Sequence, residues 1–270
     1  MRGSRMNKKL IIWCLMSSLF VGTVQLAHAE AVDKYWQGMQ KTYFPNASLE
    51  ESDAVKITAP QRAENGAQVP FAFSIDYPMT DGRYIKAVSV IADANPVPLV
   101  AVYRFSPNSV KAEVSTRIRL EMDSYVHVVA ETSDGKFLMN KVPIRAAGGC
   151  GGTIGGDEAL ARQVAGKMKL SVKSEDATPV RKAHLLIKHP MNTGLQRDLV
   201  SQGFRPAFFI SKVVAKFNDQ VVFDADTYIG VSEDPNIQFP FKADKPGTLT
   251  VLIQDNEGKE FTTVSDVLVN

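Results

Sequence analysis

Residues 111–122, KAEVSTRIRLEM, decide the fold class, because apolar and polar side chains alternate along them with a period of two. One apolar face and one hydrated face are what a half-buried antiparallel strand requires. Residues 68–77, QVPFAFSIDY, repeat the pattern. The alternation places Arg119 and Glu121 on the hydrated face and Met122 on the buried face.

More strands follow on both sides of this stretch, separated by turn signals such as Asp81-Gly82 and Asp134-Gly135. About seven short strands in roughly 95 residues, with turns at regular intervals, are typical of a β-sandwich. The remaining strands of this first half are predicted at 85–92, 98–105, 125–132 and 136–144.

A second β-rich stretch runs from about residue 170 to 269 and predicts a second sandwich. Short helices are expected at residues 32–42 and at residues 157–167, the latter capped by Asp157. The predicted fold is therefore all-β, with two sandwich domains, residues 30–147 and 168–270, joined by a glycine-rich connector, residues 148–167. Strands of the second half are predicted at 183–188, 207–217, 220–225, 237–241, 248–254 and 261–269.

Residues 1–29 have the features of a secretory signal peptide. A basic start is followed by an apolar run and by Ala27-His28-Ala29, which predicts cleavage after Ala29. Polar residues interrupt the run, so a retained membrane span is the weaker interpretation. Four of the 31 Lys and Arg lie in this segment, against 29 Asp and Glu overall, so cleavage changes the formal net charge from +2 to −2. A nucleic-acid partner is not expected.

The mature chain would keep one of the two cysteines, because Cys14 lies in the signal peptide and Cys150 follows it. Exported proteins usually pair their cysteines, so a single one indicates a reactive thiol or an intermolecular disulfide. An internal disulfide is excluded for the mature chain.

Glycines surround this cysteine, at Gly148, Gly149, Gly151 and Gly152. Such a segment packs poorly, so we expect a mobile arm with a reach on the order of 15–20 Å. Its thiol would be exposed, with a pKa near the ordinary value of about 8.5. This fits a covalent carrier better than a catalytic nucleophile, which needs an adjacent base. The glycine spacing matches no phosphate-binding loop, and a plain linker with an incidental cysteine stays as an alternative.

Residues 148–152, GGCGG, resemble the thiol-bearing arm of SoxY, one half of the SoxYZ sulfur carrier of periplasmic thiosulfate oxidation. Upstream, residues 57–60, 63–70 and 95–100 are similar to SoxY, as are residues 115–119. Downstream, residues 187–194, IKHPMNTG, and residues 206–210, PAFFI, are similar to SoxZ. The chain thus resembles a fused SoxY–SoxZ protein of the type associated with quinoprotein dehydrogenases.

The resemblance implies two immunoglobulin-like sandwiches packed as an intramolecular pair in the periplasm. It implies Cys150 as the covalent attachment point, Gly148, Gly149, Gly151 and Gly152 as the arm, and no catalytic site or cofactor of its own. Its partners would be sulfur-oxidation enzymes or a quinoprotein dehydrogenase system. In the two-chain carrier the arm is a free C-terminal tail, whereas here the chain continues beyond Gly152. A doubly tethered thiol would enter deep channels less readily.

Other functions find less support. His127, His184 and His189 lack the spacing of a metal site, and His127 is expected to be a satisfied core residue. Residues 189–191, HPM, could suggest a soft metal, although Pro190 more simply ends a strand. A thiol oxidoreductase would need a second cysteine. A non-covalent accessory module for a dehydrogenase, in which Cys150 is dispensable, remains the alternative to the carrier.

Overall fold

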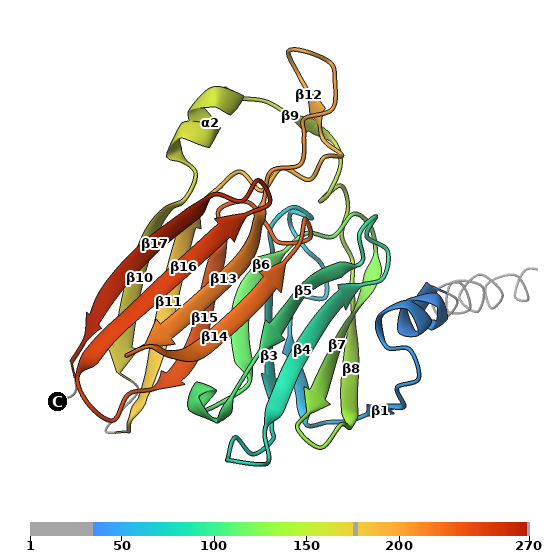
Figure 1. Ribbon diagram of the computed structural model, residues 1–270. Helices are drawn as coiled ribbons and strands as arrows, with labels where there is room; N and C mark the ends of the chain where they lie inside the picture. The colour runs from blue at the N-terminus through green and yellow to red at the C-terminus, as the bar shows by residue number, and fades with distance from the viewer. Residues whose placement is uncertain (1–34, 175–177, 269–270) are drawn as a thin grey trace, which may run out of the picture. The chain divides into compact units, whose positions relative to one another are not determined.

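The computed structural model describes residues 35–174 and 178–268. The chain divides into two compact units at Pro45. The first unit ends at Pro45, and the second, which begins at Asn46, holds all the β-strands (Figure 1). In the first unit residues 35–43 are helical, which confirms the described part of the predicted helix. The predicted signal peptide, residues 1–29, lies outside the described residues.

The second unit is almost entirely β-structure, and the all-β prediction is confirmed. Each predicted strand forms, with ends that differ by a few residues. The first half contains β1 (Leu49–Glu51), β2 (Val55–Thr58), β3 (Val69–Ile75), β4 (Ile85–Ala92), β5 (Leu99–Arg104), a 3₁₀ turn (Pro107–Ser109), β6 (Glu113–Ile118), β7 (Ser124–Thr132) and β8 (Phe137–Ile144).

The second half begins after the glycine run and adds strands that the sequence pattern does not predict, at β9, β10 and β12. The predicted helix forms and is capped by Asp157, whose carboxylate accepts the Leu160 N–H at 3.1 Å. The elements are β9 (Thr153–Ile154), α2 (Glu158–Val164), β10 (Lys167–Ser174), β11 (Val180–Lys188), β12 (Arg197–Asp198), β13 (Ile210–Phe217), β14 (Gln220–Thr227), β15 (Asn236–Lys242), β16 (Gly247–Asp255) and β17 (Glu260–Val267).

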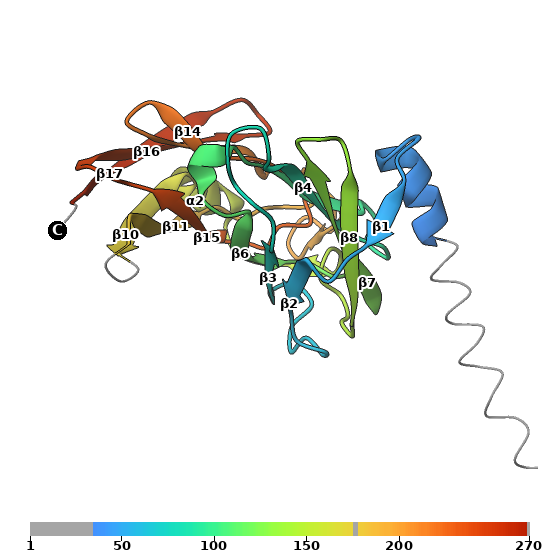
Figure 2. The ribbon, with the colours of Figure 1, turned by 90° about the horizontal axis from the view of Figure 1, so that it is seen from below.

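Two large sheets run through both halves of this unit, and Figure 2 shows them as two layers. The nine-stranded sheet has the order β1-β8-β7-β4-β5-β14-β13-β16-β17, and the six-stranded sheet has the order β10-β11-β15-β6-β3-β2. Strands β5 and β14 join the halves antiparallel in the larger sheet, as β6 and β15 do in the smaller one. The two sandwiches are therefore continuous with each other at their edges.

One hydrophobic core fills the space between the sheets and includes residues of both halves. At the β5–β14 seam, Tyr103 and Phe223 are buried with ring centroids 5.9 Å apart. On the opposite face of the seam, Arg104 pairs with Asp224 at 3.1 Å and also with Asp226. The halves are thus held together by backbone ladders, core packing and ion pairs. Among the described residues, no helix is long and apolar enough to cross a membrane.

Candidate functional site

The glycine-rich arm, residues 148–152, leaves the end of β8 and runs back along the segment that follows β6. The Gly148 N–H donates to the Glu121 carbonyl at 2.8 Å, and the Gly149 N–H donates to the Leu120 carbonyl at 3.0 Å. The alternation of residues 111–122 predicts that this segment continues as a strand, but β6 ends at Ile118. The chain beyond Ile118 instead forms the floor on which the arm lies.

Two glycines face each other where the arm meets this floor. A Cβ atom on Gly149 would stand 2.2 Å from the Gly66 carbonyl oxygen, and one on Gly66 would stand 2.3 Å from the Ala147 carbonyl oxygen. No side chain fits such a distance, so the backbones can approach only because both positions are glycine. The Leu120 N–H, which donates to the Gly66 carbonyl at 2.8 Å, completes the contact.

Arg119 is the buried cation of the site, with 3% of its surface exposed. Its guanidinium donates to three backbone carbonyls, and it thereby links the arm to the second half of the chain. The alternation predicts Arg119 on the hydrated face, and this prediction is wrong because the strand has ended before it. Burial lowers the pKa of Arg119. The three carbonyls belong to Gly149 at 3.1 Å, Met191 at 3.3 Å and Val231 at 3.3 Å.

Glu121 holds the cysteine from one side, and Thr193 holds it from the other. The Glu121 Oε2 atom accepts the N–H of Cys150 at 2.7 Å and the N–H of Gly151 at 2.9 Å. The Thr193 hydroxyl donates to the Cys150 carbonyl at 2.7 Å. Asn95 fixes the floor beneath them, because its side chain bonds the Arg119 carbonyl at 2.8 Å and the Glu121 N–H at 3.0 Å.

The glycine content predicts an exposed thiol with an ordinary pKa, and this prediction is wrong for the structure. Cys150, the free cysteine of the described residues, is 1% exposed. Burial, and to a lesser extent the Glu121 carboxylate, raise the pKa of its thiol to about 12, against the opposing effect of the Arg119 guanidinium. The thiol is therefore protonated near neutral pH in this position. The cation that acts on the pKa of the thiol is Arg119, whereas Arg145 is the cation nearest to Cys150 in sequence.

Residues 189–193 of the second half, HPMNT, are buried apart from Pro190, which is half-buried. Thr193 and Met191 reach the arm through the contacts just described, whereas His189 packs on Phe208 with ring centroids 4.3 Å apart. Burial lowers the pKa of His189 to about 4, which leaves the ring neutral near pH 7. Within residues 35–174 and 178–268, no three His, Cys, Asp or Glu side chains are grouped as metal ligands would be. His127 is buried, as expected of a core residue, and its Nδ1 atom lies 2.9 Å from an Asp93 carboxylate oxygen.

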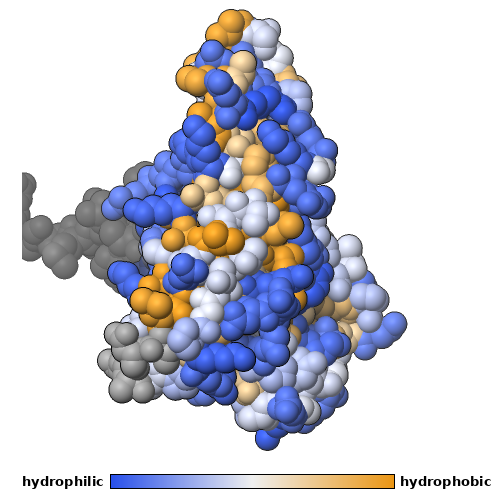
Figure 3. Space-filling model, turned by 60° about the vertical axis from the view of Figure 1, so that its left-hand side comes forward, coloured by the Kyte–Doolittle hydropathy of each residue, from blue (hydrophilic) through white to orange (hydrophobic). Residues whose placement is uncertain are grey.

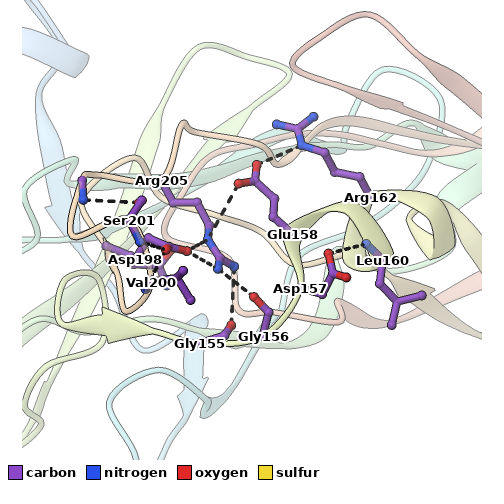
Figure 4. A network of polar contacts seen from close by, with 12 residues as sticks. Gly155, Gly156, Asp157, Glu158, Leu160, Arg162, Asp198, Val200, Ser201 and Arg205 are labelled. Carbon is purple, nitrogen blue, oxygen red and sulfur yellow. Dashed lines mark hydrogen bonds and ion pairs between the residues drawn. The ribbon is translucent and has the colours of Figure 1, made fainter.

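The end of the arm passes directly into a folded segment. The Arg197 N–H donates to the Gly152 carbonyl at 2.8 Å, and β9, the next two residues, pairs parallel with β12. Figure 4 shows how Arg205 closes this segment: its guanidinium bonds the Gly156 carbonyl at 3.0 Å and the Asp198 carboxylate. The second part of the glycine run is therefore anchored as well, although its composition predicts a linker.

Apolar side chains are exposed close to this segment, at the end of the molecule that carries β9 and β12 (Figure 3). In the sequence they lie shortly before and shortly after β12, outside the strand itself. Their exposed fractions are 39% for Leu195, 54% for Leu199, 89% for Val200 and 65% for Phe204.

The structure thus keeps the five arm residues of the sequence prediction together and adds four that the prediction did not assign to the site. Gly66 has the signature of a turn, Arg119 and Glu121 of a solvated strand face, and Thr193 lies in a motif known only by resemblance. One signal was present in the sequence. A segment as rich in glycine as the arm can pack closely against another backbone, and residues 119–122, RLEM, provide that backbone although their alternation indicates a strand. The four added residues are Gly66, Arg119, Glu121 and Thr193.

Family models match both halves of the chain. The model of SoxY, sulfur oxidation protein SoxY, matches residues 40–150, and that of SoxZ, sulphur oxidation protein SoxZ, matches residues 168–266. The SoxY match ends at Cys150 itself. No curated protein matches the chain.

Solved structures align with parts of the fold. The sulfur carrier protein SoxY from Chlorobium limicola f thiosulfatophilum is 28% identical over 43% of this chain and 98% of that chain, with a TM-score of 0.37. A superoxide reductase (neelaredoxin) from Ignicoccus hospitalis is 12% identical over 36% of this chain and 94% of that chain, with a TM-score of 0.33. The fibronectin(III)-like modules of Clostridium thermocellum CbhA are 12% identical over 80% of this chain and 94% of that chain, with a TM-score of 0.25. The two sequence matches therefore weigh more than these partial likenesses.

Proposed function

Because this chain is a fusion of a SoxY domain and a SoxZ domain, we propose that it is a covalent carrier, which holds sulfur intermediates on the Cys150 thiol and presents them to partner enzymes. The observation that carries the proposal is the place of Cys150. It is the free cysteine of the described residues, and the SoxY match ends on it. Its backbone is held by Glu121 of the first half and Thr193 of the second.

The cargo that we propose is derived from thiosulfate. Loading would join the Cys150 sulfur to the outer sulfur of thiosulfate. The thiol loses its proton, a sulfur–sulfur bond forms, and two electrons pass to an electron acceptor in the loading enzyme. The product is a cysteine S-thiosulfonate, which a reductant or a thiol can remove.

Catalysis is assigned to the partners in this proposal, because of how the thiol is held. The polar groups that bond residues 149–151 are a guanidinium, a carboxylate, a threonine hydroxyl and the Leu120 carbonyl. None of these is a base of the kind that activates a thiol near neutral pH, such as a histidine. The chain would supply the attachment point, and the loading and unloading enzymes would supply the chemistry.

We propose the periplasm as the location, on the basis of residues 1–29, and sulfur-oxidation enzymes as the partners. A cleaved chain would have a formal net charge of −2 and no tendency to bind nucleic acid. A quinoprotein dehydrogenase system is the second class of partner, proposed from the resemblance alone.

The test is the intact mass of protein purified from the periplasm under non-reducing conditions, before and after a reductant, beside Cys150→Ser. We expect a reducible adduct in increments of sulfur or sulfonate on the native chain and none on the variant. The same spectrum gives the mass of the mature chain, and loss of residues 1–29 is expected. A free-thiol mass that persists after incubation with thiosulfate and an oxidising periplasmic extract would contradict the carrier.

A second candidate function is favoured by the burial of the thiol. A protein whose Cys150 is 1% exposed could serve a dehydrogenase as a non-covalent accessory module. The two functions separate on the same variant: Cys150→Ser abolishes the function of a carrier and preserves that of a module. The measurement is growth, or dehydrogenase activity, of a strain in which the variant replaces the native chain.

A further inference from the structure

The arm is held in two different ways along its length. Its base, Gly148 and Gly149, is held by the backbone floor, by the contact with Gly66 and by Arg119. Its far end, Gly152, is held by the Arg197 N–H and by the β9–β12 pair that follows at once. Both ends of the arm therefore belong to the folded frame.

The tip of the arm is Cys150 and Gly151, and within the part of the chain that the structure describes its hydrogen bonds go to side chains. One carboxylate oxygen of Glu121 takes both N–H groups, and the Thr193 hydroxyl takes the Cys150 carbonyl. Side chains can rotate away without unfolding the frame. Gly152, with φ at +87° and nothing within 4 Å of an added Cβ, gives the tip a flexible joint on one side.

A carrier needs its thiol in solution when it is loaded, whereas Cys150 lies buried and bonded. Resting on the function proposed above, we propose that Cys150 is stored in a closed position and is presented by local opening of the tip alone. In this opening Glu121 and Thr193 release residues 150 and 151, while Gly149 and Gly152 keep their places. Glu121 and Thr193 are the positioning residues of the thiol.

The closed position also protects the thiol. Exposed thiolates oxidise and form mixed disulfides, and susceptibility follows thiolate character and exposure. A thiol that is 1% exposed and protonated has neither property. Storage in the closed position therefore limits the oxidation to which a single unpaired cysteine in an exported protein is exposed.

The two fixed ends limit how far the thiol can travel. Adjacent Cα atoms are 3.8 Å apart, so an opened tip places the sulfur at most about 7 Å from the Cα of Gly149. That reach is less than half of the roughly 15–20 Å that an unanchored glycine linker would give. The structure thus assigns this carrier to partner enzymes whose reactive site lies in a shallow, open cleft, and excludes those that receive the thiol at the bottom of a deep channel.

Alkylation by iodoacetamide measures the opening, and it does so independently of any sulfur cargo. We expect Cys150 of the native chain to react at least about a hundredfold more slowly than the same thiol in urea, because the bonds to Glu121 and Thr193 and the burial must be lost first. The rate should also continue to rise with pH beyond the ordinary thiol pKa of about 8.5.

Two variants test the positioning residues. Glu121→Gln replaces charge-assisted hydrogen bonds by neutral ones, and we expect alkylation about tenfold faster, with the apparent pKa of the reaction shifted toward the ordinary value. Thr193→Val keeps the shape of the side chain but removes the bond to the Cys150 carbonyl and the bond accepted from the Leu195 N–H. About a fivefold increase in the alkylation rate is expected from the loss of the first bond. The pH dependence of the alkylation rate distinguishes the two variants, because of these two residues only Glu121 places a charge beside the thiol.

Asp123→Asn is the matched control. The Asp123 carboxylate accepts the Ala146 N–H at 3.0 Å, so it bonds the same strand end without touching the arm. Its alkylation rate should stay within about twofold of the native rate. Native Cys150 reacting as fast as the thiol in urea would overturn the closed position. So would an unchanged rate in both test variants, provided that their thermal unfolding shows them to be folded.

Hydrogen exchange tests whether the tip opens alone. The N–H groups of Cys150 and Gly151 should exchange in parallel with alkylation, whereas those of Gly149 and Arg197, which bond the frame, should exchange far more slowly. Equal exchange at all four would mean that the whole arm leaves its site, and the short reach would be wrong. If these results hold while no sulfur adduct is found by mass, the carrier function fails and the stored thiol stands.

Discussion

The base and the tip of the arm are both rich in glycine, yet the protein uses glycine in opposite ways at the two places. At the base, an added Cβ on Gly149 would meet a carbonyl oxygen at 2.2 Å. At the tip, an added Cβ on Gly151 would meet its nearest atom, a Glu121 oxygen, at an ordinary 3.5 Å. Glycine is required by close packing at the base and leaves open space at the tip.

This difference teaches that a GGCGG sequence need not be a uniform flexible stalk. A rigid base and a releasable tip together make a short, defined movement, whereas a stalk that is flexible throughout would leave its thiol exposed. The substitutions below separate the two regions, because the base should respond in stability and the tip in reactivity.

Arg119→Met should have the largest effect on the base. The change leaves three buried carbonyls without their donor, and at about 1 kcal/mol for each the free energy of unfolding should fall by about 3 kcal/mol. Urea denaturation measures it. Arg117→Met, two residues earlier, removes a guanidinium that bonds only the exposed Gln68 side chain and should cost about 0.5 kcal/mol or less. Equal losses in both variants would show that Arg119 is not special to the arm.

Gly149→Ala should come next, with a loss of about 2–3 kcal/mol, because the added methyl group overlaps the Gly66 carbonyl and both backbones must separate. Thermal and urea unfolding measure the loss. Gly151→Ala is the control at the tip, where the change should remain within about 0.5 kcal/mol. A tip variant as unstable as the base variant would remove the distinction between the two regions.

Gly152→Ala should cost about 1 kcal/mol, for a reason unlike that at Gly149. Nothing lies within 4 Å of the added Cβ, but φ is +87°, in the region that L-residues avoid. Gly203→Ala, in the loop that follows β12, has no positive φ and only a 3.7 Å contact to the Ser201 side chain, so it should be near neutral. The stability difference between the two variants isolates the backbone term from steric overlap.

The fold was largely predictable, because strand alternation is a local property of sequence. Residues 85–92 were predicted as a strand and form β4 with those ends. The joining of the two halves was not predictable, since β5 and β14 carry no mark that they pair with each other rather than with a strand of their own half. The short strands β9 and β12, two residues each, are too brief for any period to register.

The candidate site was predictable in its nucleophile and not in its surroundings. Cys150 stood out as the single mature cysteine, but its burial depends on contacts with Gly66, Arg119 and Thr193, which are distant in sequence. Glycine propensity describes an isolated chain, and it predicted exposure. Tertiary contacts reversed that prediction, because glycine also permits the closest backbone packing. Arg119, predicted to be hydrated, is buried, and Met122, predicted to be buried, is 55% exposed, because the alternating pattern continues after the strand has ended.

The smallest effect should be the pH dependence of stability that Cys150 contributes. Its thiol pKa is raised in the folded protein to about 12, so the folded state favours the protonated thiol. The contribution is complete below the unfolded-state pKa of about 8.5 and is lost as pH rises from there toward the folded value. Relative to Cys150→Ser, which does not titrate, the native chain should lose about 0.8 kcal/mol between pH 7 and pH 9. Parallel urea titrations at the two pH values measure it. A difference that is independent of pH would mean that the thiol is exposed in the folded state, and that the tip, unlike the base, has no closed position.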